Sequence, residues 1–133
     1  MIKTLPDEND ARQYIPGVCN IGKKEIQQRR NGIFFALALL IVVVVLLEVF
    51  KADKLWRLIV FLPATSLAVS FQQWYFKFCV GFGMKGVFNF GDLGKTFTVE
   101  QKEYFQKDRA KATKMIVAGI VFGLVLTLIY YFL

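Results

Sequence analysis

The chain has 133 residues, of which 56% are hydrophobic and 16% aromatic, and its formal net charge is +7. Its apolar residues are gathered into long blocks, and the stretch from Ile33 to Leu47 holds no polar side chain. A soluble helical protein would spread such residues at a 3.6-residue period, so the pattern indicates an integral membrane protein of one domain. The chain has no histidine, which removes the usual haem ligand, the usual general base near neutral pH and the zinc-protease motifs.

Residues 1–32 form the first region, which we expect to be a cytosolic arm. Asn20 is a candidate cap for a short basic helix from Lys23 to Arg30. Asn31 and Gly32 then predict a turn or hinge just before the first membrane helix.

Residues 33–78 predict a hairpin of two transmembrane helices, at about 33–50 and 55–78. The connection between them is so short that the two helices must be antiparallel neighbours. Ala64 and Ala68 lie four residues apart on the second helix, a spacing of small residues that lets another backbone come close. Gln72 and Gln73 mark the inner end of this helix and are candidates to lie at an interface or to line a path.

Residues 79–97 predict an inner loop that is rich in glycine and phenylalanine. Phe82, Phe88 and Phe90 would be exposed to water in an ordinary loop, so we expect this loop to lie at the membrane surface or to re-enter the membrane. Its first part fits the letters of a dinucleotide-binding fingerprint, but that motif must follow a strand and open a helix in a βαβ unit. Here it follows a predicted membrane helix, so we interpret its glycines as sites where the chain turns sharply.

Residues 98–133 predict one long helix, half in water and half in the membrane. Thr98 and Gln101 have the spacing of a capping box at a helix start, and no proline follows them. A helix from Val99 to the last residue would be about 52 Å long, against about 30 Å of hydrocarbon. Because only the run from Met115 onward is apolar, we expect the first part of the helix to extend about 20 Å into the cytosol.

Gly119 and Gly123 form the most specific motif in the chain, a GxxxG pair inside an apolar helix. This spacing makes a shallow groove that a second backbone can approach closely. The predicted association surface is one row of four residues, Met115, Gly119, Gly123 and Thr127. Its partner is either another part of the same molecule or another chain.

The basic residues predict the orientation. Fourteen of the 17 lysines and arginines lie in residues 1–32 or 77–114, so the positive-inside rule places the amino terminus in the cytoplasm and the carboxyl terminus outside. A bacterial cytoplasmic membrane is the expected location. The basic face predicts contact with anionic lipids or a partner; nucleic acid is disfavoured because acidic residues are interspersed in helix-stabilising pairs. Its candidate residues are Lys23, Lys24, Arg29, Arg30, Lys107, Arg109, Lys111 and Lys114.

Cys19 and Cys79 are both expected beside the inner ends of the first two membrane helices, where they form a candidate thiol pair. Without histidine, two thiolates do not complete a four-ligand zinc site within one chain. The sequence therefore predicts no metal and no cofactor, while a bound lipid is compatible with it.

Three classes of function fit an all-α fold with three transmembrane helices. The favoured class is a small, non-catalytic interaction protein, an accessory or assembly subunit that joins other transmembrane chains in a hetero- or homo-oligomer. One alternative is a homo-oligomeric channel or small transporter, with Gln72, Gln73 and the inner loop along its path. The other is a membrane enzyme or a lipid- or quinone-binding protein that uses Cys19, Cys79 and the aromatic loop.

Overall fold

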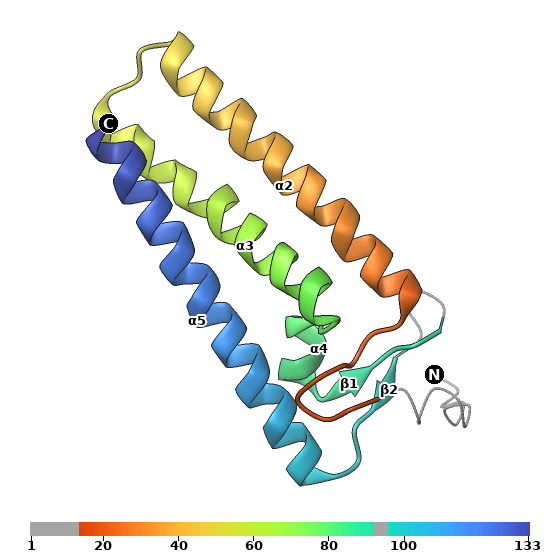
Figure 1. The fold of residues 1–133 in the computed structure, drawn as a ribbon. Coiled ribbons are helices and arrows are strands. Elements are labelled where there is room, and N and C mark those ends of the chain that lie inside the picture. Colours follow the sequence, from red (N-terminus) through yellow and green to blue (C-terminus); the bar gives the residue numbers. More distant parts are fainter. Residues whose placement is uncertain (1–13, 92–95) are drawn as a thin grey trace.

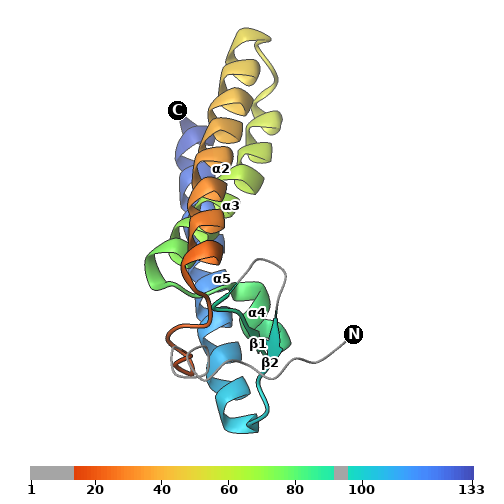
Figure 2. The same ribbon diagram turned by 90° about the vertical axis from the view of Figure 1, so that its right-hand side faces the viewer.

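The computed structural model describes residues 14–91 and 96–133, which are mostly helical. The first part of the expected cytosolic arm and four residues of the predicted inner loop lie outside the described residues. Three helices are long and apolar enough to cross a membrane: α2 (Lys23–Val49), η1 with α3 (Lys54–Phe76) and α5 (Lys102–Phe132). Helix α3 lies between α2 and α5 and packs against both (Figure 1), and the three overlap when the molecule is turned by 90° (Figure 2). The long helices therefore form a single layer.

Helix α2 is continuous from Lys23 to Val49, so the predicted short basic helix and the predicted turn at Asn31-Gly32 are wrong. The lysines, glutamines and arginines of its first turns are good helix formers, and one glycine inside a helix costs only about 1 kcal/mol. Gly22 is the N-cap residue, without a side-chain cap, so the expected capping role of Asn20 is also wrong.

The second long helix begins as the 3-10 helix η1 (Lys54–Val60) and continues as the α-helix α3 (Phe61–Phe76). Pro63 lies in the first turn of α3, where a proline is tolerated. The helix ends at Phe76, and the next residue, Lys77, adopts a left-handed conformation with φ 54°. Its N–H bonds to the carbonyl oxygen of Gln73 and closes the last turn.

The predicted inner loop contains regular structure. It holds a short helix, α4 (Val80–Lys85), and a strand, β1 (Val87–Phe88), which pairs antiparallel with β2 (Phe97–Thr98). The fold is thus not strictly all-α. Thr98 bonds in a strand ladder, so the predicted capping box is wrong: α5 begins at Lys102 with no side-chain cap and is about 46 Å long.

The two ends of the layer differ. One end, called here the polar end, holds residues 14–22, the first turn of α2, α4, both strands with the residues directly after β1, and the first three turns of α5. The other, the hairpin end, holds the α2–η1 connection and the last turn of α5 (Figure 1). Helix α4 can approach α5 closely because Gly83 has no side chain: an added Cβ would lie 3.0 Å from the carbonyl oxygen of Asp108. A small apolar core forms there from Phe78, Val80, Ala112 and Met115.

Candidate functional site

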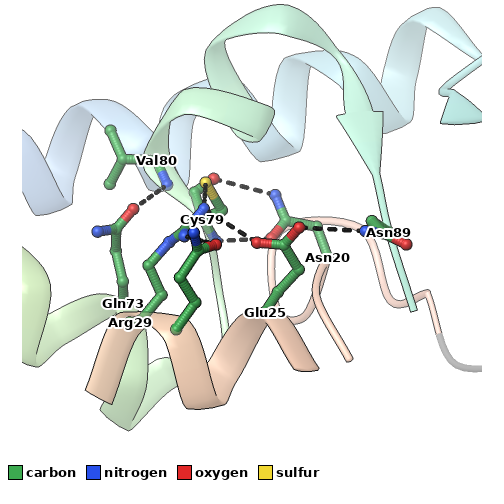
Figure 3. Close-up of polar contacts among 8 residues, drawn as sticks. Asn20, Glu25, Arg29, Gln73, Cys79, Val80 and Asn89 are labelled. Carbon is green, nitrogen blue, oxygen red and sulfur yellow. Dashed lines mark hydrogen bonds and ion pairs between the residues drawn. The ribbon is translucent and has the colours of Figure 1, made fainter. Parts of the chain in front are cut away.

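The polar end holds most of the buried polar side chains of the described residues. Asn20, Glu25, Asn89 and Asp108 are all buried there, although they come from four different segments of the chain. Figure 3 shows three of them beside Cys79 and Arg29: Asn20 bonds to Cys79, while Glu25 lies between Arg29 and Asn89. Because burying an unpaired polar group is costly, the partners of these side chains decide what the cluster does.

Asn20 pairs with both backbone groups of Cys79 (Figure 3). Its Nδ2 donates to the carbonyl oxygen of Cys79 at 3.1 Å, and its Oδ1 accepts the N–H of Cys79 at 2.7 Å. On the other side, the N–H of Asn89 donates to the carbonyl oxygen of Asn20 at 2.9 Å, and that of Gly22 donates to the carbonyl oxygen of Asn89 at 2.8 Å. The N-terminal segment is thus fastened between α4 and the residue that follows β1.

Glu25 is a buried carboxylate in the first turn of α2. Its Oε1 accepts a hydrogen bond from Asn89 Nδ2 at 3.1 Å, and its Oε2 lies 3.4 Å from Arg29 Nη2. The same Nη2 lies 3.0 Å from Cys79 Sγ, and the guanidinium stands over the Phe82 ring, 5.9 Å from its centroid. Arg29 was predicted to contact lipid or a partner, but its guanidinium contacts groups of its own chain. Removing either Arg29 or Glu25 would leave the charge of the other unpaired.

Asp108 fastens the N-terminal segment to α5. Its Oδ2 accepts a hydrogen bond from the Tyr14 hydroxyl, and its Oδ1 accepts the N–H of Gly17 at 2.7 Å. Burial, together with the hydrogen bond to the Asp108 carboxylate, raises the pKa of Tyr14 far above its usual value. The phenol therefore stays protonated and serves as a permanent donor.

The phenylalanines of the predicted inner loop differ in exposure. Phe88 is buried and stacks on Tyr14, with ring centroids 4.7 Å apart, while Phe97 and Phe90 lie 5.8 and 6.1 Å from Phe88. Phe82 and Phe90 are half-buried. The chain itself covers Phe88, so this side chain does not need the membrane surface as a cover.

The two cysteines have separate partners. The half-buried Cys19 donates its thiol to the carbonyl oxygen of Ile21 at 3.6 Å, whereas Cys79 Sγ faces Arg29, and both thiols are free. Burial raises the pKa of the Cys19 thiol. Across residues 14–91 and 96–133, no three cysteine, aspartate or glutamate side chains gather as a possible metal site. The polar groups at this end therefore serve to hold four segments of the chain together by hydrogen bonds and an ion pair.

The row predicted for helix association is buried on α5. It consists of Met115, Gly119, Gly123 and Thr127. A Cβ added at Gly119 would lie 2.6 Å from Val69 Cγ2, and one added at Gly123 would lie 2.1 Å from Thr65 Oγ1. The groove is therefore occupied by α3 of the same chain. The remaining members of the predicted surface lie on α3: Ala64, which is buried, and Ala68, which is half-buried.

The two glutamines of α3 bond to this chain's own backbone. Gln72 Nε2 donates to the carbonyl oxygen of Met115 on α5 at 3.0 Å, and Gln73 Oε1 accepts the N–H of Val80 at 3.0 Å. The first contact fastens α3 to α5, and the second holds the start of α4 against the end of α3. Both amides are thus used inside the layer.

A second polar cluster joins all three long helices at the hairpin end. The Tyr130 hydroxyl donates to Glu48 Oε1 at 2.7 Å, and Arg57 Nη2 lies 3.8 Å from the same oxygen. Arg57 Nη1 also donates to the carbonyl oxygens of Tyr130 and Tyr131, at 3.2 and 3.4 Å. These carbonyls belong to the last turn of α5, so the arginine of η1 acts as a side-chain cap of this turn, and the Tyr130 carbonyl also accepts the N–H of Leu133.

The other predicted basic residues lie at the surface. Lys111 is half-buried, and its Nζ stands 4.1 Å from the centroid of the Phe76 ring. The exposed members of the set are Lys23, Lys24, Arg30, Lys107, Arg109 and Lys114. Sequence reasoning did not single out Asn20, Asp108 or Arg57 for these contacts, because their partners are distant in the chain.

Comparison with protein-family models, with curated proteins and with solved structures gives no match for this chain. The dinucleotide-like letters at 81–86 lie in and just after α4, which follows α3 and not a strand, so they lack the setting that this motif needs. The geometry of the two polar clusters and of the exposed surface is therefore the basis for assigning a function.

Proposed function

We propose that the protein is an integral membrane protein whose three long helices cross the bilayer. The most apolar 18-residue stretches of these helices are only 6%, 17% and 22% buried within the chain. Exposing so much apolar surface is unfavourable in water but not in hydrocarbon. A helix can also lie in hydrocarbon because its backbone groups hydrogen-bond within the helix.

The exposed tryptophans support this placement. Trp56, 59% exposed, lies near the start of η1, and Trp74, 37% exposed, lies near the end of α3. Four residue steps in η1 and fourteen in α3 separate them by about 29 Å. This length matches the hydrocarbon thickness of about 30 Å, and tryptophan is enriched at both membrane–water interfaces.

The polar end supports the orientation. Its exposed basic residues outnumber its exposed acidic ones, and Glu25 and Asp108 are in addition buried and hydrogen-bonded. The positive-inside rule then favours a cytoplasmic polar end, with the carboxyl terminus outside, and we infer a bacterial cytoplasmic membrane.

We propose that the protein acts there as a non-catalytic accessory or assembly subunit. The observation that carries this proposal is the single layer: α3 is flanked by α2 and α5, and large apolar side chains remain exposed along all three helices. Polar clusters at both ends hold the layer together, so it offers two firm apolar faces to lipids and to the transmembrane helices of other chains.

The two other classes lack such support. Gln72 and Gln73, which a channel would place along its path, bond to the backbone of their own chain. The enzyme class uses the two cysteines and the aromatic loop, but the two sulfurs have separate partners in Ile21 and Arg29, and Phe88 of the loop is packed inside the chain.

The deciding experiment is the native mass of the protein after gentle detergent extraction from its own membranes. We expect unlike chains to co-purify at a fixed ratio. Phe35, 73% exposed on α2, allows a surface test, since Phe35→Ala should weaken a contact on that helix without unfolding the chain, and Phe122→Ala is the matched change on α5. A protein that always runs alone at monomer mass would refute the subunit proposal.

A further inference from the structure

We propose that the cytoplasmic junction of α3 and α5 binds the anionic headgroups of phospholipids in the same bilayer, through Lys77, Lys111 and Lys114. The inference rests on the membrane placement proposed above. It selects one site from the broad basic surface, and it adds Lys77, which lies at the end of α3.

The junction has one cation held in position. Lys111 Nζ stands over the Phe76 ring, 4.1 Å from its centroid, and this ring is itself exposed. A cation–π contact orients the ammonium group without neutralising its charge, so less side-chain freedom is lost when an anion binds. Phe76 is the last residue of α3, which places the charge at the point where the apolar helix ends.

Two more exposed lysines stand close to this point in their helices. Lys77 directly follows Phe76 and is exposed, and its left-handed backbone ends the helix there. Lys114 is exposed three residues after Lys111, on the same side of α5 and next to the start of its apolar run. No described carboxylate pairs with any of the three within ion-pair distance, and none of them hydrogen-bonds elsewhere in the described residues.

The depth of the junction fits a lipid headgroup. Phe71, Trp74 and Tyr75 are exposed on the last two turns of α3, and Phe71 packs against each of the other two rings. Aromatic side chains of this kind are enriched at the level of the headgroups. The three lysines lie at the cytoplasmic edge of this belt, where a lipid phosphate is found.

The neighbouring negative charges do not cancel this site. Asp108 is buried and accepts hydrogen bonds from Tyr14 and Gly17, while Glu103 lies eight residues before Lys111, about 12 Å along the helix. The end of α3 carries about half a negative charge from its dipole, against three ammonium groups. The local field therefore favours an anion.

The test is a lipid titration followed by native mass spectrometry in a mild non-ionic detergent, with phosphatidylglycerol and phosphatidylcholine as the two probes. The wild-type chain should bind phosphatidylglycerol more tightly, and the preference should fall as salt is added. Lys77→Gln with Lys111→Gln should weaken phosphatidylglycerol binding by about fivefold per lysine, or roughly 30-fold together. Circular dichroism checks that this variant stays helical.

The matched control removes the same charge farther from the membrane. Lys85→Gln with Lys102→Gln changes two exposed lysines of the polar end and should alter binding by less than about threefold. Equal binding of the two lipids by the wild-type chain would overturn the inference, as would an equal loss in the control variant. Membrane placement is tested separately: release of the protein from membranes by alkaline carbonate would refute that placement, whatever the lipid preference.

Discussion

Replacing Gly123 by alanine should destabilise the contact between α5 and α3. The new Cβ would lie 2.1 Å from Thr65 Oγ1 and 3.2 Å from the Thr65 backbone nitrogen. The hydroxyl can rotate away, but the nitrogen cannot, so the helices must separate by a few tenths of an ångström. Such overpacking costs about 1–3 kcal/mol, while alanine in place of glycine gains up to about 1 kcal/mol of helix propensity. The net loss should be up to about 2 kcal/mol.

The matched control is Gly81→Ala, in α4. There the nearest atom to an added Cβ is Cys79 Sγ at 3.9 Å, an ordinary contact, so only the gain in helix propensity applies. The two variants should differ by about 1–3 kcal/mol in unfolding free energy, measured in detergent by circular dichroism. If they are equally stable and Gly123→Ala instead lowers the native mass, the glycine row contacts another chain and the packing described above is refuted.

Three further predictions concern the polar groups. Asn20→Ala leaves the buried N–H and carbonyl of Cys79 unpaired and should lower the unfolding free energy, measured by thermal unfolding, by about 1–3 kcal/mol. The control Asn31→Ala, at an exposed position, should lower it by less than about 0.5 kcal/mol. Similar losses in the two variants would contradict the hydrogen bonds assigned to Asn20. Arg57→Gln removes the cap of α5 and should cost about 1–2 kcal/mol by the same assay, whereas the exposed Lys51→Gln should cost little. Because the pKa of Cys19 is raised, less of this thiol is ionised at a given pH. Its alkylation rate at pH 8, followed on the peptide that contains Cys19, should be slower in the folded chain than after denaturation, and the rate should continue to rise above pH 9. Equal rates in the folded and denatured chains would refute the burial of Cys19.

The long apolar helices were predictable because their signal is local. The run from Ile33 to Leu47 and the run that begins at Met115 each exceed what a soluble core helix uses, and the structure has long helices at both. Helix starts depend on single residues, and the predicted starts of α2 and α5 were wrong, whereas the predicted boundaries near residues 50, 55 and 78 lie within two residues of the observed ones. Gly32 resembles a hinge in the sequence, yet a helix already continuous on both sides tolerates it.

The polar end was not predictable, because its contacts join segments that are far apart in the chain. Asn20 has the local chemistry of a helix cap, but its side chain reaches the backbone of Cys79, 59 residues away. Thr98 likewise has the pattern of a capping box and instead pairs with Val87. Asparagine and threonine side chains can hydrogen-bond in several local conformations, and the tertiary contacts decide which one forms.

The proposed membrane placement gives a physical reason for the polar bonds at both ends of the layer. Within hydrocarbon, burying apolar side chains between helices gains little, since lipid tails are equally apolar. Close packing at Gly119 and Gly123, the Gln72 bond and the clusters around Asn20 and Arg57 must therefore fix how the helices lie together. Because these contacts lie between the helices or at their ends, a partner helix can replace lipid on either face of the layer without breaking one of them, as an assembly subunit requires.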